Sequence, residues 1–337
     1  LRPPPAPPML ILRSAEVRRL LSFPDCIEAM DQAMRAASLG QVDTPERTIA
    51  VLPDGASYFF VMPGSMAGDG ARAPVYGAKL IGLHPSNTAG GIPAIQGYVS
   101  LFDGCSGTPS ALVDGAEITR LRTAAASALA TRELARPDAR THGIFGAGVQ
   151  AAGHLEAIAC VRPIEEIRVW ARNAERARAF VKPYASWPGP RVIAVDDPSL
   201  AGACDVVSVV TNASVPVLRG RWLNDGAHIN LVGAHEAHHR EADTEAVARA
   251  AVYVDSRQGA LSEAGDLLIP IGEGKFSRDH IIGEIGEVLE GKAPGRRNET
   301  QVTLYKSLGV FAQDLFAAVR VLEAARQAGA GESVDFP

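Results

Sequence analysis

Thr141 to His154 spell T-H-G-I-F-G-A-G-V-Q-A-A-G-H, and this stretch decides the fold of the chain. A short apolar run leads into Gly146-x-Gly148-x-x-Ala151, and a helix-compatible sequence follows. This order is typical of the strand, glycine turn and helix start of a dinucleotide-binding βαβ unit. Gly146 permits the tight turn, Gly148 lets the backbone approach a pyrophosphate, and Ala151 keeps the helix close to the strand. The free N–H groups at the helix N-terminus would then bind the phosphates.

The second strand of this unit indicates which nicotinamide cofactor is preferred. A β-like run at residues 167–170 is followed by Ala171-Arg172-Asn173. An enzyme that uses NAD carries an acidic residue about 20 residues after the glycines, where it binds a ribose hydroxyl. Arg172 stands at this strand end instead, and Arg176 and Arg178 follow on the next helix. Because a cation suits a 2′-phosphate, we predict that NADPH is preferred and NADH possible; the alternative is that these arginines only mark a solvated helix start.

The composition indicates a soluble protein with two domains. The chain has 337 residues, of which 47% are hydrophobic, and its net charge is −5. That length leaves room for two domains, and the negative charge argues against a nucleic-acid partner. No run of about 18 apolar residues occurs, so no membrane span is expected. The four cysteines form no CxxC pair, which suits reduced thiols in a cytoplasmic protein, and the proline-rich residues 1–8 are expected to be a disordered lead-in.

Hydrophobic periodicity divides the rest of the chain into two predicted domains. Residues 126–304 alternate strands with helices, which predicts a Rossmann-type, doubly wound parallel sheet in an α/β fold. Residues 9–125 and 305–337 are expected to form an α+β substrate-binding and dimerisation domain, with one amphipathic helix from Tyr305 to Gln327. Helices are also expected at 23–39 and 118–134. The predicted strands are 47–51, 58–62, 76–81 and 97–102 in the first domain, and 144–145, 167–170, 192–195, 205–210, 228–232 and 251–254 in the second.

Three cations of the first domain are candidates for binding a substrate. Lys79 lies among apolar residues of a predicted strand, where burial is unfavourable unless the ammonium meets an anion. Arg122 lies on a helix that becomes small and apolar directly afterwards, and Arg47 begins a strand. Together they could converge on one carboxylate, to which an arginine offers a bidentate fork. The alternative for each of them alone is a surface charge.

Taken together, these residues and the motifs below make the sequence resemble the ornithine cyclodeaminase/mu-crystallin family. The resemblance extends from about Met9 to Gln327, and the order and spacing of its motifs match throughout. The motifs are the strand of Arg47, Gly77-Ala78-Lys79, Asn87 through Gly91-Ile92-Pro93, Ile118 to Ala125, the Gly146 loop, Asn230-Leu231-Val232-Gly233-Ala234 and Lys306-Ser307-Leu308-Gly309.

The resemblance implies a redox enzyme that acts at the α-carbon of small amino and imino acids with a nicotinamide cofactor. It places Arg47, Lys79, Arg122 and Leu308 against the substrate, and it implies a homodimer joined through the domain that does not bind the cofactor. The residues expected at the cofactor are Thr123, Gly146, Gly148, Val149, Gln150, Arg172, Asn173, Arg176, Thr211, Val232, Gly233 and Ser307.

The sequence departs from the family pattern at two positions, and the first of them narrows the reaction. The resemblance implies that true ornithine cyclodeaminases carry an aspartate two residues after the glycine that matches Gly233, where this chain has His235. The family's usual threonine after Gly-Leu-Pro is Ala94 here, which weakens what the resemblance implies at that position. An aspartate can hold the side-chain amine of ornithine, whereas a histidine offers no fixed anion. A cyclic imino acid has no such amine, and His235 could supply or relay the proton that its imine nitrogen needs. We therefore expect Lys79, Arg122 and His235 to be catalytic in reducing Δ1-pyrroline-2-carboxylate or Δ1-piperideine-2-carboxylate to L-proline or L-pipecolate.

Other functions remain as alternatives. They are ornithine or lysine cyclodeamination, an alanine-type dehydrogenase, and a non-catalytic NADPH-binding or small-ligand-binding protein similar to mu-crystallin. His235-Glu236-Ala237-His238-His239 also matches the H-E-x-x-H zinc pattern. That pattern requires a helix, whereas here it directly follows a predicted strand, so we predict no metal site.

Overall fold

The computed structural model describes residues 8–68 and 73–335. It contains two compact units, here called the first unit (residues 1–122 and 310–337) and the second unit (residues 123–309). Of the lead-in expected at residues 1–8, residues 1–7 lie outside the described part. The predicted domain boundaries, 125/126 and 304/305, compare with 122/123 and 309/310 in the structure.

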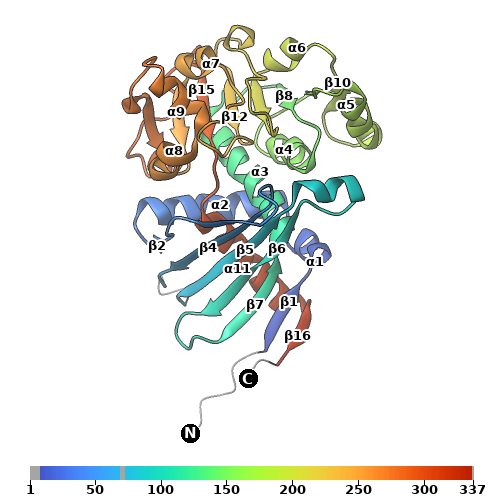
Figure 1. The fold of residues 1–337 in the computed structure, drawn as a ribbon, viewed down its shortest axis with the longest axis vertical. Helices are drawn as coiled ribbons and strands as arrows, with labels where there is room; N and C mark the ends of the chain where they lie inside the picture. Colours follow the sequence, from blue (N-terminus) through green and yellow to red (C-terminus); the bar gives the residue numbers. More distant parts are fainter. Residues whose placement is uncertain (1–7, 69–72, 336–337) are drawn as a thin grey trace. The chain divides into compact units, whose positions relative to one another are not determined.

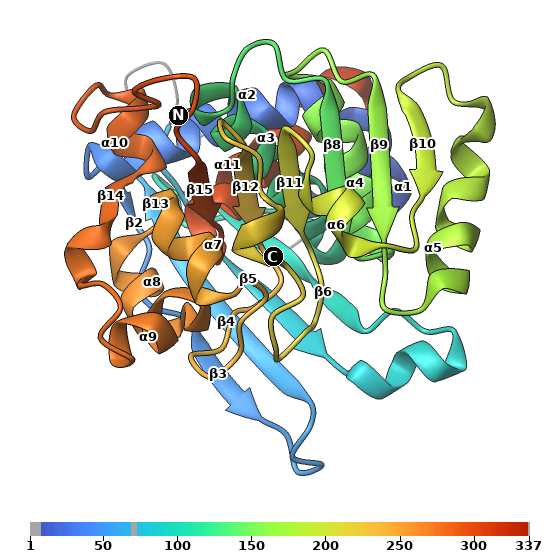
Figure 2. The ribbon, with the colours of Figure 1, turned by 90° about the horizontal axis from the view of Figure 1, so that it is seen from above.

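The second unit is built on one sheet of eight parallel strands in the order β10-β9-β8-β11-β12-β15-β13-β14 (Figure 2). Strands β11, β12, β13 and β15 are buried along their whole length, as expected for parallel strands that are covered on both faces. This confirms the predicted Rossmann-type parallel sheet. The strands are β8 (Thr141–Phe145), β9 (Glu166–Trp170), β10 (Arg191–Ala194), β11 (Val206–Val209), β12 (His228–Leu231), β13 (Ala251–Val254), β14 (Ile281–Glu284) and β15 (Thr303–Lys306).

Helices join these strands and follow the expected alternation. They are α4 (Val149–Ala159), α5 (Ala174–Val181), α6 (Pro198–Gly202), α7 (Thr244–Arg249), α8 (Arg257–Glu263), α9 (Gly265–Gly272) and α10 (Ile285–Leu289), with short 3₁₀ turns η2 (Lys182–Ser186), η3 (Gly220–Trp222) and η4 (Arg278–His280). The strand order reverses between β8 and β11, so the glycine loop that follows β8 lies at the switch point. Because all strands are parallel, the segments that follow them meet at one edge of the sheet.

The first unit is an α+β structure with a mainly antiparallel sheet in the order β16-β1-β7-β6-β5-β4-β2, with β3 also paired to β4 (Figure 1). Only β1 and β7 run parallel among the strand pairs in the described part of this sheet. The strands are β1 (Met9–Leu12), β2 (Val42–Asp43), β3 (Thr48–Val51), β4 (Tyr58–Met66), β5 (Val75–Leu83), β6 (Ile95–Asp103), β7 (Pro109–Asp114) and β16 (Glu332–Val334).

Four helices belong to the described part of the first unit, and one of them continues into the second. They are α1 (Ser14–Leu20), α2 (Phe23–Ser38), α3 (Gly115–Leu134) and α11 (Phe311–Ala328), together with the 3₁₀ turn η1 (Pro85–Gly90). Helix α11 packs against α2 and against β4, β5 and β6. It therefore brings the C-terminal part of the chain onto the N-terminal sheet.

The predicted helix from Tyr305 to Gln327 needs two corrections. Residues 303–306 form β15, which pairs with both β12 and β13 inside the second sheet, and the helix begins only at Phe311. An apolar run of this length does not distinguish a buried strand from a helix start. Moreover, every residue from Phe311 to Val319 is buried, so this half of α11 is enclosed rather than amphipathic.

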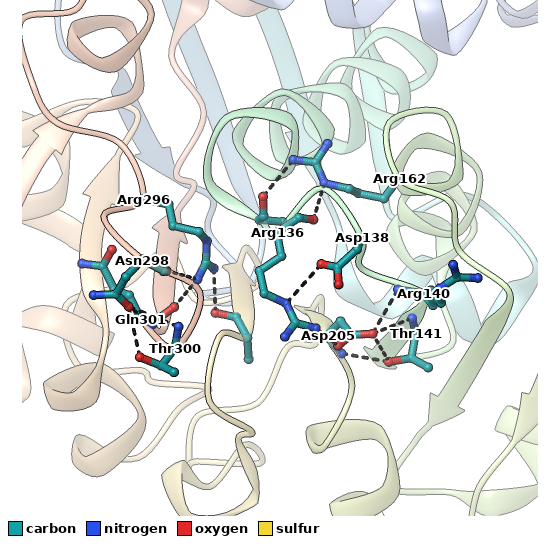
Figure 3. A network of polar contacts seen from close by, with 12 residues as sticks. Arg136, Asp138, Arg140, Thr141, Arg162, Asp205, Arg296, Asn298, Thr300 and Gln301 are labelled. Atoms are coloured by element: carbon teal, nitrogen blue, oxygen red, sulfur yellow. Dashed lines mark hydrogen bonds and ion pairs between the residues drawn. The ribbon is translucent and has the colours of Figure 1, made fainter.

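The amino ends of the parallel strands are held by a polar network (Figure 3). Asp205 accepts hydrogen bonds from Arg136 Nη2 at 2.7 Å, from the backbone N–H groups of Arg140 and Thr141 at 3.0 Å, and from Thr141 Oγ1 at 2.8 Å. Arg296 donates to Leu134 O at 2.7 Å and to Thr303 Oγ1 at 3.0 Å. These bonds connect the end of α3 to the starts of β8 and β15. The network therefore stabilises the fold of the second unit.

Candidate active site

Lys79, Arg122 and Asp314 form a buried cluster in the first unit. Lys79 Nζ lies 2.9 Å from both carboxylate oxygens of Asp314, and Arg122 Nε lies 3.0 Å from Oδ1. Arg122 Nη1 also donates to Gln313 Oε1 at 2.9 Å. The exposed fractions are 4% for Lys79, 5% for Arg122 and 0% for Asp314. Strand β5, helix α3 and helix α11 thus each contribute one charged group to the same enclosed position.

The surroundings of Lys79 make it a weak base. Burial lowers the pKa of Lys79 to about 8, because the charged ammonium loses its hydration. Asp314 opposes this change, whereas the positive charges of Arg122 and Arg47 add to it. Arg47 precedes β3 and is half-buried, and its charge acts on the same ammonium. The structure thus brings the three predicted cations into one electrostatic environment.

The cluster contains two cations and one carboxylate, so it carries one excess positive charge when all three groups are ionised. A buried excess charge is unfavourable unless an opposite charge compensates for it. Lysine and arginine together offer about eight N–H donors, more than Asp314 and Gln313 can accept. The cluster is consequently suited to binding a further anion. Asp314 lies 235 residues from Lys79, and it was not predicted from the sequence.

The glycine loop of the second unit has the geometry that phosphate binding requires. Gly146 has a φ of +121°, and a Cβ atom there would lie 2.8 Å from Val210 O. Gly148 is the N-cap of α4 without a side chain to cap the helix, and open space lies where its Cβ would be. The first amides of α4, including those of Val149 and Gln150, are therefore not capped by a side chain at Gly148. Ala151 is fully buried, as the close helix–strand packing requires.

The residues expected to select the cofactor lie after β9. Arg172 and Arg176 are exposed. Asn173 caps α5, since its side chain accepts a hydrogen bond from the backbone N–H of Arg176. Arg178 differs from the other two arginines because it pairs with Glu175 and Asp196.

Most of the other predicted cofactor residues follow parallel strands, at the same edge of the sheet. Thr211 follows β11, Val232 and Gly233 follow β12, and Ser307 follows β15. The backbone N–H of Ser307 donates to Leu231 O at 2.9 Å, and the half-buried Leu308 donates its N–H to Asp255 Oδ2 at 2.7 Å. Thr123 is buried on α3 instead. The structure therefore gathers residues from distant parts of the sequence at the edge where the glycine loop lies.

A search of family models matches residues 8–329 to the ornithine cyclodeaminase/mu-crystallin family. The chain belongs to this family. A Delta(1)-pyrroline-2-carboxylate reductase of Bacillus cereus is 35% identical over 330 residues, which cover 97% of this chain and 100% of that protein. The ketimine reductase mu-crystallin of Mus musculus is 37% identical over 84% of this chain and 86% of that protein. The resemblance inferred from the sequence is confirmed.

A solved structure supports the fold of this member of the ornithine cyclodeaminase/mu-crystallin family. It is the Thermococcus litoralis Delta(1)-pyrroline-2-carboxylate reductase in complex with NADH and L-proline. Its TM-score to this chain is 0.91 at 35% identity, and the match covers 97% of this chain and 100% of that chain. The predicted fold class, a Rossmann-type sheet with an α+β unit, agrees with this neighbour.

His235 lies on an irregular loop after β12. His235 is exposed, and its Nδ1 lies 3.0 Å from Gly233 O. The H-E-x-x-H pattern is not on a helix here, as expected. Ligand atoms of Glu236, His238 and His239 nevertheless lie within 4.8 Å of one another, and two ion pairs, His238–Glu236 and His239–Glu236, account for this proximity. The grouping omits His235, so it differs from the zinc-protease arrangement.

Three polar residues that organise these sites, Asp314, Gln313 and Glu241, were not predicted from the sequence. Asp314 and Gln313 had one available signal, since they are polar residues in a stretch of helix that is otherwise apolar. Glu241 gave none, because it lies in the polar run Arg240-Glu241-Ala242-Asp243. Its role depends on contacts that only the fold creates.

Proposed function

We propose that this protein reduces a cyclic imino acid at C2, converting Δ1-pyrroline-2-carboxylate, Δ1-piperideine-2-carboxylate or both into L-proline or L-pipecolate. The observation that carries this proposal is the buried Lys79–Arg122–Asp314 cluster with its excess positive charge. The relatives described above are a pyrroline-2-carboxylate reductase and a ketimine reductase, and this supports the same reaction class for this chain.

The cations of the first unit would bind and orient the substrate. Arg122 and Arg47 would hold the carboxylate, and Arg122 is already oriented by its bonds to Asp314 and Gln313. Leu308 is the apolar contact to the ring that the family resemblance implies. Fixing the carboxylate restricts the imine to a reactive orientation, which lowers the entropic part of the barrier.

The imine nitrogen must be protonated so that C2 becomes electrophilic. Lys79 is suited to hold that proton, because burial brings its pKa to about 8, close to physiological pH. Asp314 keeps the ammonium in place through both of its oxygens. His235 is the second candidate, as a relay between solvent and the site, and its exposure is compatible with that role.

The second unit fits a nicotinamide dinucleotide. Its glycine loop leaves open space at Gly148 before the uncapped start of α4, which suits a pyrophosphate. When bound, the cofactor supplies the hydride for C2. We propose NADPH as the preferred form, with NADH also accepted, because exposed arginines at positions 172 and 176 suit a 2′-phosphate. The solved relative was obtained with NADH, which supports a nicotinamide cofactor in general.

His235 argues against cyclodeamination as the main activity. That reaction must bind the side-chain amine of ornithine or lysine, and a carboxylate is the group that pairs with it. A histidine at this position supplies no fixed negative charge. An alanine-type dehydrogenase is the remaining alternative with catalysis, and a non-catalytic ligand-binding protein is the alternative without it.

The test compares two assays on the same purified protein. NADPH oxidation is followed at 340 nm with Δ1-pyrroline-2-carboxylate, and ammonia release from L-ornithine is measured with NAD⁺. We expect imine-dependent oxidation without ammonia release. Ammonia and proline from ornithine would instead establish the cyclodeaminase reaction, and NADPH binding without turnover of either compound would favour a binding protein.

The proposal also covers the oligomeric state and the cellular role of the protein. We propose a homodimer, to be tested by light scattering on the eluting protein, and a cytoplasmic role in proline metabolism with only small molecules as substrates. Among the described residues, no helix is both long enough and apolar enough to cross a membrane.

A further inference from the structure

A second buried charge cluster lies in the second unit and takes no direct part in the proposed chemistry. It consists of Glu241, Asp266 and Lys306, each with 0% exposure. Glu241 lies on the loop after β12, Asp266 in the first turn of α9, and Lys306 at the end of β15. Three separate segments of the chain therefore meet through charged side chains.

Glu241 joins the segments that follow β11 and β12. Its Oε1 accepts hydrogen bonds from Thr211 N at 2.7 Å and from Thr211 Oγ1 at 2.6 Å. Its Oε2 accepts from Gly233 N at 2.6 Å and from Ala234 N at 3.0 Å. The two segments also touch directly, because a Cβ atom on Gly233 would lie 1.8 Å from Thr211 O. A single carboxylate thus defines the spacing of two predicted cofactor contacts.

Asp266 and Lys306 extend the same connection to β15. Asp266 Oδ1 accepts from the backbone N–H groups of Glu241 at 2.7 Å and Ala242 at 3.0 Å. Lys306 Nζ donates to Asp266 Oδ2 at 2.9 Å and to Ala234 O. Lys306 directly precedes Ser307, another predicted cofactor contact. The cluster therefore fixes the segments after β11, β12 and β15 relative to one another.

Two carboxylates and one ammonium without solvent are costly to bury, so the arrangement needs compensation. Burial raises the pKa of Glu241 to about 7, with Asp266 adding to the effect, while Lys306 and the bonds from Thr211 act in the opposite direction. The four donors to Glu241 compensate for part of the lost hydration. An apolar core could hold these segments together without such a cost, but it could not orient the individual backbone N–H groups.

We propose that Glu241 is a positioning residue for the nicotinamide cofactor, which acts by holding the segments of Thr211, Gly233 and Ser307 in the geometry that binds it. This inference rests on the cofactor use proposed above, although it does not depend on which substrate is reduced. A residue with this role affects cofactor affinity directly, and substrate affinity only through the cofactor.

The matched control is Asp205, the other acceptor of four hydrogen bonds at the opposite edge of the same sheet. Glu241→Gln and Asp205→Asn are compared for NADPH dissociation constant by fluorescence titration and for thermal unfolding. We expect both variants to unfold at lower temperature. Only Glu241→Gln should raise the dissociation constant, by at least tenfold. The side-chain NH2 group of glutamine cannot accept the backbone hydrogen bonds that one carboxylate oxygen accepts in the wild type.

The kinetic readout separates positioning from general destabilisation. At saturating NADPH, Glu241→Gln should keep the KM for the imine within about threefold of the wild-type value, while the KM for NADPH rises. If Glu241→Gln does not fold, Glu241→Asp, which keeps the charge but shortens the reach, is held to the same criterion. A cofactor affinity within twofold of wild type in Glu241→Gln, or an equal loss in Asp205→Asn, would overturn the inference. NADPH binding without imine turnover in the wild type would count against the proposed function alone.

Discussion

The first and second units each bury a cluster of three charged side chains, and the two clusters have opposite compositions. Lys79, Arg122 and Asp314 comprise two cations and one carboxylate, whereas Glu241, Asp266 and Lys306 comprise two carboxylates and one cation. In the second cluster, backbone N–H groups use the carboxylate oxygens that Lys306 does not reach. The first cluster instead retains more donors than acceptors.

This difference indicates two distinct purposes for buried charge. A cluster whose excess charge is met by its own backbone is complete without a ligand, and it positions the segments that contribute to it. A cluster with an excess of cationic donors is completed by an anion from outside the chain. This contrast supports the proposal that the first cluster binds the substrate and that the second orders the cofactor edge.

The strongest test of this comparison makes the same substitution in both clusters. Asp314→Asn raises the net charge of the first cluster from +1 to +2, and Asp266→Asn changes that of the second from −1 to 0. Leaving buried cations uncompensated typically costs about 3–5 kcal/mol, so Asp314→Asn should lower the free energy of unfolding by about that amount. Asp266→Asn also breaks a buried ion pair, but the charge of Glu241 still opposes that of Lys306, so the loss should be smaller, about 1–3 kcal/mol. Urea unfolding measures both, and the reverse order would show that net charge does not distinguish the clusters.

Removing the ammonium of Lys79 should damage catalysis severely. A general acid contributes roughly 10²–10⁴-fold to a rate, so Lys79→Met should lower kcat/KM for the imine at least hundredfold, or about 2.7 kcal/mol. Lys182→Met, at an exposed lysine of η2, is the control and should leave kcat/KM unchanged. A loss below threefold in Lys79→Met would remove Lys79 from the mechanism.

The pH profile of the wild-type enzyme should reveal the same group. Since burial lowers the pKa of Lys79 to about 8, the protonated form is lost as pH rises through that value. We expect kcat/KM to fall about tenfold per pH unit above it, measured with substrate well below KM. An activity that is constant from pH 7 to 10 would be inconsistent with Lys79 as the proton donor.

Substitution of Arg172 should change cofactor preference without affecting the clusters. Arg172→Ala should weaken NADPH binding about tenfold relative to NADH, because only NADPH carries the 2′-phosphate. Arg178→Ala is the matched control, since Arg178 already pairs with Glu175 and Asp196. The dissociation constants of NADPH and NADH are measured by titration of both variants. An equal loss of NADH and NADPH in Arg172→Ala would mean that Arg172 does not bind the 2′-phosphate.

The smallest expected effect concerns His235. If His235 relays protons from solvent, His235→Asp should lower imine turnover by a few-fold and alter its pH dependence. The variant also restores the aspartate of cyclodeaminase-like sequences, so ammonia release from ornithine is measured in parallel. An unchanged rate and pH profile would make His235 a spectator.

Much of the fold was readable from local patterns. Gly146, Gly148 and Ala151 specify a turn that few other residues allow, and the apolar runs of β8, β9 and β11 to β13 predicted the parallel sheet. β14 was not predicted, and β15 was mistaken for the start of a helix. Short apolar runs have no period that separates strand from helix, and β15 enters between β12 and β13, far from its sequence neighbours.

The candidate site shows the same division between local and distant information. The apolar surroundings of Lys79 and Arg122 made them candidates, because burying a cation in such a context requires an anion, and the family resemblance then placed them against the substrate. That the anion inside the chain is Asp314, and that Glu241 closes the segments after β11 and β12, followed only from the tertiary structure. The sequence by itself determined which residue types were out of place; the folded chain decided their partners, because electrostatic and hydrogen-bond energies depend on distance in space and not on separation along the chain.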